Sequence, residues 1–196
     1  MALPRPRWIS PAEWPPVSPD TSIRKASPCT ADGRIGRLSV IRRPPQVDTV
    51  VMAVKPYVVE GVLKQIAEAL KGKAMLSVVA GYTFERYQPL VDASVRVQYV
   101  MPNTPCMVGA GMLLFEERHS LTPEEHETAL SMFRALGEVE ILDAHLMDAA
   151  TAISGCGPAF AAMMIEALAD AGVKYGLPRA VAYRLASQMA LGTGKM

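Results

Sequence analysis

Three short stretches of the chain combine residue types that could contact a ligand: Ala53-Val54-Lys55-Pro56, Ala80-Gly81 and Asn103-Thr104-Pro105. Each follows an apolar run that is typical of a buried strand, and each joins small or polar residues to a turn. In a doubly wound α/β sheet, ligands bind outside the carboxyl ends of the strands. Backbone amides and the Lys55 ammonium could therefore approach a dinucleotide. One such turn alone is an ordinary strand-to-helix connection, but three in chain order favour a cofactor crevice.

A dinucleotide site also needs a glycine-rich turn where the pyrophosphate meets the start of a helix. The candidate in this sequence is the AxGxxG stretch at residues 31–36. It lacks the first glycine, the residues before it do not resemble a strand, and the segment after it makes a poor helix. We therefore reject it as a phosphate loop and predict that the first βαβ unit of the fold is missing or replaced.

Other reactive side chains lack the neighbours that their chemistry requires. Cys156 lies between two glycines just before an expected helix, an environment that can activate a thiol. No histidine has a local relation to it, so we favour a small residue in a tight turn. The histidines are His119, His126 and His145. They share no metal-ligand spacing and no CxxC pair occurs, so we predict neither a metal site nor a disulfide framework.

The composition is that of a soluble globular protein, because half of the 196 residues are hydrophobic and a fifth are charged. The formal net charge is only +1, whereas a nucleic-acid-binding face normally carries a clear excess of Lys and Arg. We therefore predict no nucleic-acid partner. No unbroken apolar run approaches the roughly 18 residues of a membrane span, so we predict no membrane segment. The start of the chain lacks a hydrophobic signal core and the cysteines suit a reducing compartment, which predicts a cytoplasmic protein.

The first 46 residues differ from the rest of the chain. They hold nine of the sixteen prolines and show no apolar periodicity, so we predict an irregular Pro- and Arg-rich leader. From Val47 onward, strands alternate with helices, which indicates an α/β domain with a partial Rossmann-type parallel sheet. The expected strands are residues 49–54, 74–80, 95–100, 111–115 and 139–142. The first is a continuous apolar run, typical of a strand covered on both faces.

Helical signals fall between these strands. The expected helices are residues 59–70, closed by Gly72, a short helix that opens near Thr83, and a helix that begins at Thr122 and stops at Gly137. Thr122 can cap the last of these, Pro123 fits its first turn, and Glu125 completes a capping box.

The chain is expected to be all helical from His145 onward. Residues 160–165 form an unbroken apolar run, whereas a surface helix shows a polar half. We therefore predict that the helix containing this run is buried on most sides. The predicted organisation is a leader at residues 1–46, a partial NAD(P)-binding Rossmann domain at 47–143, and the start of a helical domain at 144–196.

Eight pieces of the sequence, in this order and spacing, resemble pyrroline-5-carboxylate reductase. They are residues 53–56, 77–81, 101–105, 148–152, 154–159, 167–174, 176–179 and 191–196. The resemblance implies a Rossmann domain followed by a helical domain that builds dimers and larger rings. It also implies the reduction of a small cyclic imine, 1-pyrroline-5-carboxylate, to L-proline by NADP(H) or NAD(H), and a homo-oligomer.

The resemblance places particular residues at the cofactor and leaves the catalytic residues open. In the family, an Ala-Val-Lys-Pro turn contacts NAD(P)H, a second turn follows the next strand, and an asparagine lies beside the nicotinamide end. Residues 154–158 match the hinge between the two domains. The corresponding cofactor residues here are Ala53, Val54, Lys55, Pro56, Ala80, Gly81 and Asn103.

The sequence also departs from the family pattern. The family begins with a strand, a GxGxxA-type loop and a helix where this chain has its leader, and it continues beyond Met196 into further helices and a substrate-carboxylate loop. Ala144 stands near a position where relatives carry a glutamate, and Cys156 replaces a usual serine. We therefore expect weak cofactor binding and little or no turnover.

Two alternatives to an active reductase stay open. The chain could be a non-catalytic fragment that associates with full-length reductase subunits through its helical end. It could also be a related dehydrogenase with a different small substrate, since hydroxy-acid dehydrogenases share this architecture. The Asn103-Thr104-Pro105 stretch together with residues 154–158 favours the imine reductase over the dehydrogenase.

Overall fold

The computed structural model describes residues 48–196, so the predicted leader and the rejected loop at residues 31–36 lie outside the described part. Within it, five strands form one sheet in the order β1-β2-β3-β4-β5. The strands are β1 (Thr49–Met52), β2 (Ala74–Ser77), β3 (Arg96–Met101), β4 (Gly111–Glu116) and β5 (Gly137–Leu142). This arrangement confirms the predicted α/β class.

The sheet is mostly parallel, as predicted, with one exception. β1, β2 and β3 are parallel neighbours and β4 is parallel to β5, whereas β3 and β4 pair antiparallel. The connection between β3 and β4 is residues 102–110. It is shorter than the dozen or so residues that a parallel crossover needs, so the chain can only turn back beside β3.

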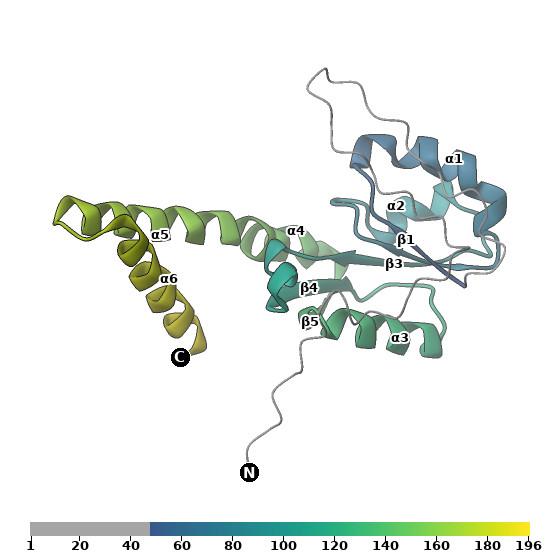
Figure 1. The fold of residues 1–196 in the computed structure, drawn as a ribbon. Helices are drawn as coiled ribbons and strands as arrows, with labels where there is room; N and C mark the ends of the chain where they lie inside the picture. The colour runs from purple at the N-terminus through teal and green to yellow at the C-terminus, as the bar shows by residue number, and fades with distance from the viewer. Residues whose placement is uncertain (1–47) are drawn as a thin grey trace, which may run out of the picture. The chain divides into compact units, whose positions relative to one another are not determined.

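Helices cover both faces of this sheet. Those of the α/β part are η2 (Pro56–Val58), α1 (Val59–Leu70), α2 (Phe84–Tyr87), η3 (Gln88–Leu90), η4 (Thr104–Val108) and α3 (Pro123–Arg134). Figure 1 shows α1 and α2 on one face and α3 on the other. One apolar cluster packs Met52 and Met75 against Leu63 of α1, and a second packs Leu76 and Phe115 under α3.

The strand β1 is covered on one face only, so the prediction of a strand covered on both faces was wrong. Met52 is buried and Val50 packs toward α1, but Val51 on the opposite face is 51% exposed. The reason is that α3 packs on this second face against β2, β3 and β4. Within the described residues it does not extend as far as β1. An apolar run identifies a strand but does not show how far the covering helix extends.

The predicted start of α3 is confirmed in full. The Thr122 side chain accepts a hydrogen bond from the Glu125 amide, the Glu125 carboxylate accepts one from the Thr122 amide, and Pro123 occupies the first turn. The helix ends at Arg134 rather than at Gly137, because Gly137 already begins β5. A Cβ on Gly137 would lie 2.0 Å from the Gly111 carbonyl oxygen, so the close pairing of β4 and β5 requires glycine there.

The C-terminal part is helical from Ala144, one residue before the predicted start at His145. Its elements are η5 (Ala144–Leu146), α4 (Met147–Thr151), the π-helical turn η6 (Ala152–Cys156), α5 (Gly157–Lys174) and α6 (Arg179–Lys195). α6 packs against α5, and an ion pair of 2.7 Å joins Arg179 to Asp170. Gly172 allows this approach, since a Cβ there would meet the Ala182 Cβ at 3.3 Å.

The apolar helix α5 lies largely at the surface, so the prediction that it is buried on most sides was wrong. Phe160 and Met163 are each 66% exposed, and Ala169 is the buried residue that the structure records for this helix. The reason is that α5 meets α6 through small side chains, so its large side chains have no partner within the described chain. The continuous helix Ala144–Lys174 is also long and apolar enough to span a membrane by length and composition, although charged residues such as Glu166 interrupt its apolar run.

Candidate functional site

The three turns predicted from the sequence lie at one edge of the sheet. The Ala-Val-Lys-Pro turn follows β1, Ala80 and Gly81 follow β2, and Asn103 follows β3. These strands are parallel neighbours, so their carboxyl ends meet at the same edge. The structure therefore brings together all the residues that the sequence proposed for cofactor binding.

These residues differ in how open they are to solvent. Val54 packs against the apolar cluster under α1 and orients its turn, whereas Asn103 is half-buried. The exposed members are Ala53, Lys55, Pro56, Ala80 and Gly81. The first two turns can therefore meet a ligand directly, with Lys55 supplying a positive charge.

The Gly81 turn is held on two sides and open on a third. The Gly81 amide donates to the Tyr99 hydroxyl at 3.2 Å, and the Gly81 carbonyl accepts from the Arg86 guanidinium at 3.1 Å. Arg86 also lies 4.1 Å from the centre of the Tyr82 ring. With a φ of 72°, Gly81 adopts a conformation that favours glycine, and the space where a Cβ would lie is empty. A ligand can therefore approach this backbone closely.

Two buried tyrosines lie on the core side of this region: Tyr99 binds the Gly81 amide, and Tyr87 binds the end of β2. The Tyr87 hydroxyl shares a 2.7 Å hydrogen bond with the Ser77 hydroxyl at the end of β2. Burial raises the pKa of Tyr87 to about 12, and burial also raises the pKa of Tyr99. Both hydroxyls therefore stay protonated at neutral pH and act as fixed neutral groups.

A buried carboxylate completes this support. Glu116, at the end of β4, is fully buried, and its Oε2 accepts a hydrogen bond from the Phe84 amide at 2.7 Å. Sequence reasoning found neither Glu116 nor Tyr99. A charged residue that ends the apolar run of β4 was the available signal, but nothing in the sequence shows that it points inward.

Asn103 joins the sheet to the helical part. Its side-chain Nδ2 donates to the Ser154 carbonyl at 2.9 Å, and its Oδ1 accepts from the Met112 amide at 2.9 Å. The Cys106 thiol also donates to Oδ1, at 3.8 Å. Both polar atoms of Asn103 are thus engaged within the chain. Its placement beside a nicotinamide stays a prediction, and its visible task is to connect β3, β4 and η6.

The chemistry of Pro158 explains why Ser154 can accept this bond. In an α-helix the Ser154 carbonyl would accept from the amide four residues later, but Pro158 has no N–H. The Asn103 side chain supplies the missing donor. The turn η6 is π-helical at this point, and such turns are frequent at functional sites. The junction at residues 154–158, which the family resemblance implies to be a hinge, is therefore bonded to the sheet edge through Asn103.

The remaining candidates do not form a second site. Cys156 is exposed and has no resolved partner among the described residues that would activate it. His119 and His126 stack with ring centres 4.2 Å apart. Within residues 48–196, no three His, Cys, Asp or Glu side chains gather as a metal ion would require.

The sheet edge fits part of a dinucleotide. Lys55 and the open Gly81 backbone suit a nucleotide that lies across the strand ends. Residues 48–196 contain no GxGxxG loop for a pyrophosphate. The described residues therefore fit the cofactor along the turns of β1, β2 and β3, without a pyrophosphate-binding loop among them.

Several known proteins with similar sequences carry the same description. Residues 144–196 match the protein family described as pyrroline-5-carboxylate reductase dimerisation. The chain is 39% identical to the pyrroline-5-carboxylate reductase of Treponema pallidum over 172 residues, and 41% identical to that of Synechocystis over 149 residues. The chain belongs to the pyrroline-5-carboxylate reductase family. The sequence-based resemblance is confirmed.

Solved structures of the reductase family agree. The pyrroline carboxylate reductase of Plasmodium falciparum, solved with NADP bound, superposes with a TM-score of 0.72 at 36% identity and matches 76% of this chain. The chain spans 57% of that protein, 65% of the Treponema reductase and 55% of the Synechocystis reductase. Family and fold are therefore shared with these reductases over a little more than half of their length.

Proposed function

We propose that this chain takes part in the NADPH- or NADH-dependent reduction of 1-pyrroline-5-carboxylate to L-proline. The observation that carries the proposal is the sheet edge, where the turns at Lys55 and Gly81 lie at the same strand ends as Asn103, and Asn103 binds the helical junction at Ser154. The similarity to named reductases and to a reductase that holds NADP supports it.

The chemistry needs a held cofactor and an oriented imine. When bound, a nicotinamide cofactor would supply the hydride for the imine carbon; the C=N π electrons would move to the ring nitrogen, which would take up one proton to give the amine of proline. Lys55 and the Gly81 backbone would bind the cofactor. Asn103 would hold the junction at Ser154 against the same edge, so that helical residues lie close to the imine. The protein thus contributes mainly orientation and electrostatics.

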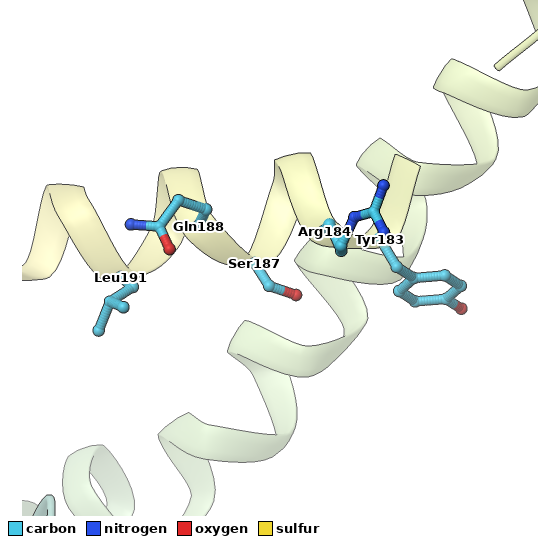
Figure 2. Close-up of a pocket in the computed structure, with 5 residues that line it drawn as sticks. All are labelled: Tyr183, Arg184, Ser187, Gln188 and Leu191. Carbon is cyan, nitrogen blue, oxygen red and sulfur yellow. The ribbon is translucent and has the colours of Figure 1, made fainter. Parts of the chain in front are cut away.

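We also propose that the helical part mediates association with a second copy of the chain. The exposed apolar side chains of α5 fall in the segment that matches the dimerisation family. A shallow groove on α6 lies in the same segment and shares no residue with the three turns. Figure 2 shows the side chains that line it, Tyr183, Arg184, Ser187, Gln188 and Leu191. We propose that subunit contact, rather than a lipid bilayer, accounts for this apolar surface, and that the protein is cytoplasmic.

The first test of catalysis is NADPH oxidation by the purified, folded chain with 1-pyrroline-5-carboxylate, with proline measured as the product. We expect substrate-dependent proline formation at a rate well below that of a full-length relative, because residues 48–196 lack a pyrophosphate loop. Lys55→Ala should lower the rate further, whereas Lys64→Ala on the exposed face of α1 should not. A folded sample that forms no proline would refute catalysis by the chain alone.

The alternative is a non-catalytic partner of complete reductase subunits. The lack of a GxGxxG loop in residues 48–196 favours it, because such a chain could associate through α5 and α6 without binding a whole cofactor. Native mass spectrometry of the chain mixed with a full-length relative would show a mixed oligomer of defined stoichiometry. Aggregation of the chain with itself alone would count against this function.

A further inference from the structure

The carboxyl group of Glu116 is buried, and its contacts offer no clear gain in stability. The residue is 0% exposed, its Oε2 accepts one hydrogen bond, and its Oε1 has no partner among the described residues. A buried carboxylate that accepts a single hydrogen bond is costly, because the charge loses its hydration and one oxygen gains no partner in return. Such a group is therefore a candidate for a functional role.

The single bond of Glu116 connects it to the proposed cofactor turn. Its donor, the Phe84 amide, opens α2 three residues after Gly81. The Tyr99 hydroxyl binds the Gly81 amide at the other end of the same turn. Two side chains from the adjacent strands β3 and β4 thus hold both ends of residues 81–84 from the buried side.

Three charged side chains and one neutral hydroxyl, from four parts of the chain, surround Glu116. Burial is the largest influence and raises the pKa of Glu116, and the Phe84 amide opposes it. Glu85 of α2 raises the pKa further, Arg118 after β4 lowers it, and Asp143 after β5 raises it. Tyr99 of β3 faces the same carboxylate as a neutral hydroxyl. Proton uptake by Glu116 is therefore expected at a higher pH than for an ordinary glutamate.

We propose that Glu116 is a positioning residue for the cofactor turn, and that residues 81–84 loosen when Glu116 takes up a proton. The role as a cofactor turn rests on the proposed function; the coupling between Glu116 and the turn does not. An ionised carboxylate makes a charge-assisted bond to the Phe84 amide, and a neutral carboxyl makes a weaker one. The difference in strength between these two bonds corresponds to about a tenfold change in the equilibrium constant for local opening of residues 81–84.

Amide NMR tests the coupling directly. In the wild-type chain, the Gly81 and Phe84 amide signals should titrate together with the Glu116 side-chain carboxyl carbon, with one midpoint above the ordinary glutamate value of about 4.3. Signals of Ala129 in α3 should stay unchanged over this range, which shows that the fold is intact. Different midpoints for the carboxyl and the amides, or amides that do not titrate, would overturn the proposal without any variant.

A matched pair of variants sharpens the test. Glu116→Gln should remove the titration at Gly81 and Phe84 and speed hydrogen exchange of the Phe84 amide about tenfold at neutral pH. Glu125→Gln is the control, because Glu125 also accepts a backbone amide bond at a helix start but lies away from the turn. Persistence of the turn titration in Glu116→Gln would overturn the proposal.

NADPH fluorescence separates this inference from the proposed function. If the chain binds NADPH, its affinity should fall as the pH is lowered, with the same midpoint as the amide signals. The Glu116→Gln variant should bind NADPH several-fold more weakly, and its affinity should not depend on pH. If the wild-type chain binds no NADPH while the amides titrate as expected, the proposed function fails and the coupling of Glu116 to the turn stands.

Discussion

The α/β part and the helical part of this chain use apolar residues in different ways. The α/β part, residues 48–143, packs large side chains such as Met75, Leu113 and Phe115 into clusters under its own helices. In the helical part, residues 144–196, the buried positions are mainly alanines, while Phe160, Met163 and other large apolar side chains are exposed.

This difference shows that the apolar content of a helix does not reveal whether its large side chains pack within the same chain. In the helical part, small residues form the contact between α5 and α6, and Ala169 and Ala182 are almost fully buried there. The large side chains are left for a contact outside the described chain. The α/β part packs most of its core under its own helices, and Met147 of α4 completes a further cluster with Tyr99 and Leu114. The helix α5, in contrast, leaves large apolar side chains exposed, and such apolar surface marks a contact site.

Two phenylalanines test this comparison with the largest expected effect. Phe115 is 0% exposed and Phe160 is 66% exposed. Phe115→Ala should lower the free energy of unfolding by about 3–5 kcal/mol. Phe160→Ala should change it by less than about 0.5 kcal/mol when the chain is monomeric. Urea unfolding at low protein concentration measures both, and equal losses would show that the helical part is packed as fully as the sheet.

The connection between the two parts is tested at Asn103. Asn103→Ala removes the donor to the Ser154 carbonyl and the acceptor for the Met112 amide, so the unfolding free energy should fall by about 2 kcal/mol. Hydrogen exchange should rise most at residues 154–159. Thr104→Ala, an exposed neighbour, serves as the control. Unchanged exchange at residues 154–159 would mean that the junction is held by other contacts.

Self-association sharpens the comparison from the helical side. Phe160→Asp places a charge on the exposed apolar face of α5, so dimer affinity should fall at least about tenfold, or 1.4 kcal/mol. Analytical ultracentrifugation measures it. Lys64→Glu on α1 lowers the net charge by two units, against one unit for Phe160→Asp, and should still leave the affinity unchanged. A wild-type chain that stays monomeric at high concentration would leave the apolar face of α5 without the proposed partner.

The features that the sequence predicted well depend on neighbouring residues. The Thr122 cap and Glu125 lie three positions apart, and the three turns follow strands that were recognisable by themselves. Their common edge then follows from the parallel order of the strands. Local patterns were thus sufficient for the α/β class and for the place of the candidate site.

The features that the sequence did not predict join distant residues. The Gly81–Tyr99 bond spans 18 positions, the Phe84–Glu116 bond 32, and the Asn103–Ser154 bond 51. Such contacts depend on strand order and on which face a side chain occupies, neither of which a single run of residues specifies. The error at α5 has the same origin, because an apolar helix does not reveal whether its partner lies in the same chain.

The smallest expected effect is a pH dependence of the folding stability, which we assign to His119 in the α/β part. His119 Nδ1 accepts a hydrogen bond from the Leu121 amide at 3.2 Å, and its ring stacks on that of His126. Burial lowers the pKa of His119, and the neighbouring His126 lowers it further. The folded chain therefore binds fewer protons at this site than the unfolded chain, whose histidine has a pKa near 6.5. This contribution to stability is complete above about pH 6.5 and is lost as the pH falls below it.

Urea midpoints between about pH 8 and pH 5 measure this dependence. His119→Asn keeps an acceptor near the position of Nδ1 but cannot titrate. The variant should therefore lack the part of the change in urea midpoint with pH, near pH 6.5, that comes from His119. His145→Asn is the matched control, because the His145 side chain is 73% exposed and lies at the start of the helical part. If the slope is unchanged in His119→Asn but flattened in His145→Asn, the pH-sensitive group belongs to the helical part. The half-buried His119 would then contribute nothing to the pH dependence of stability.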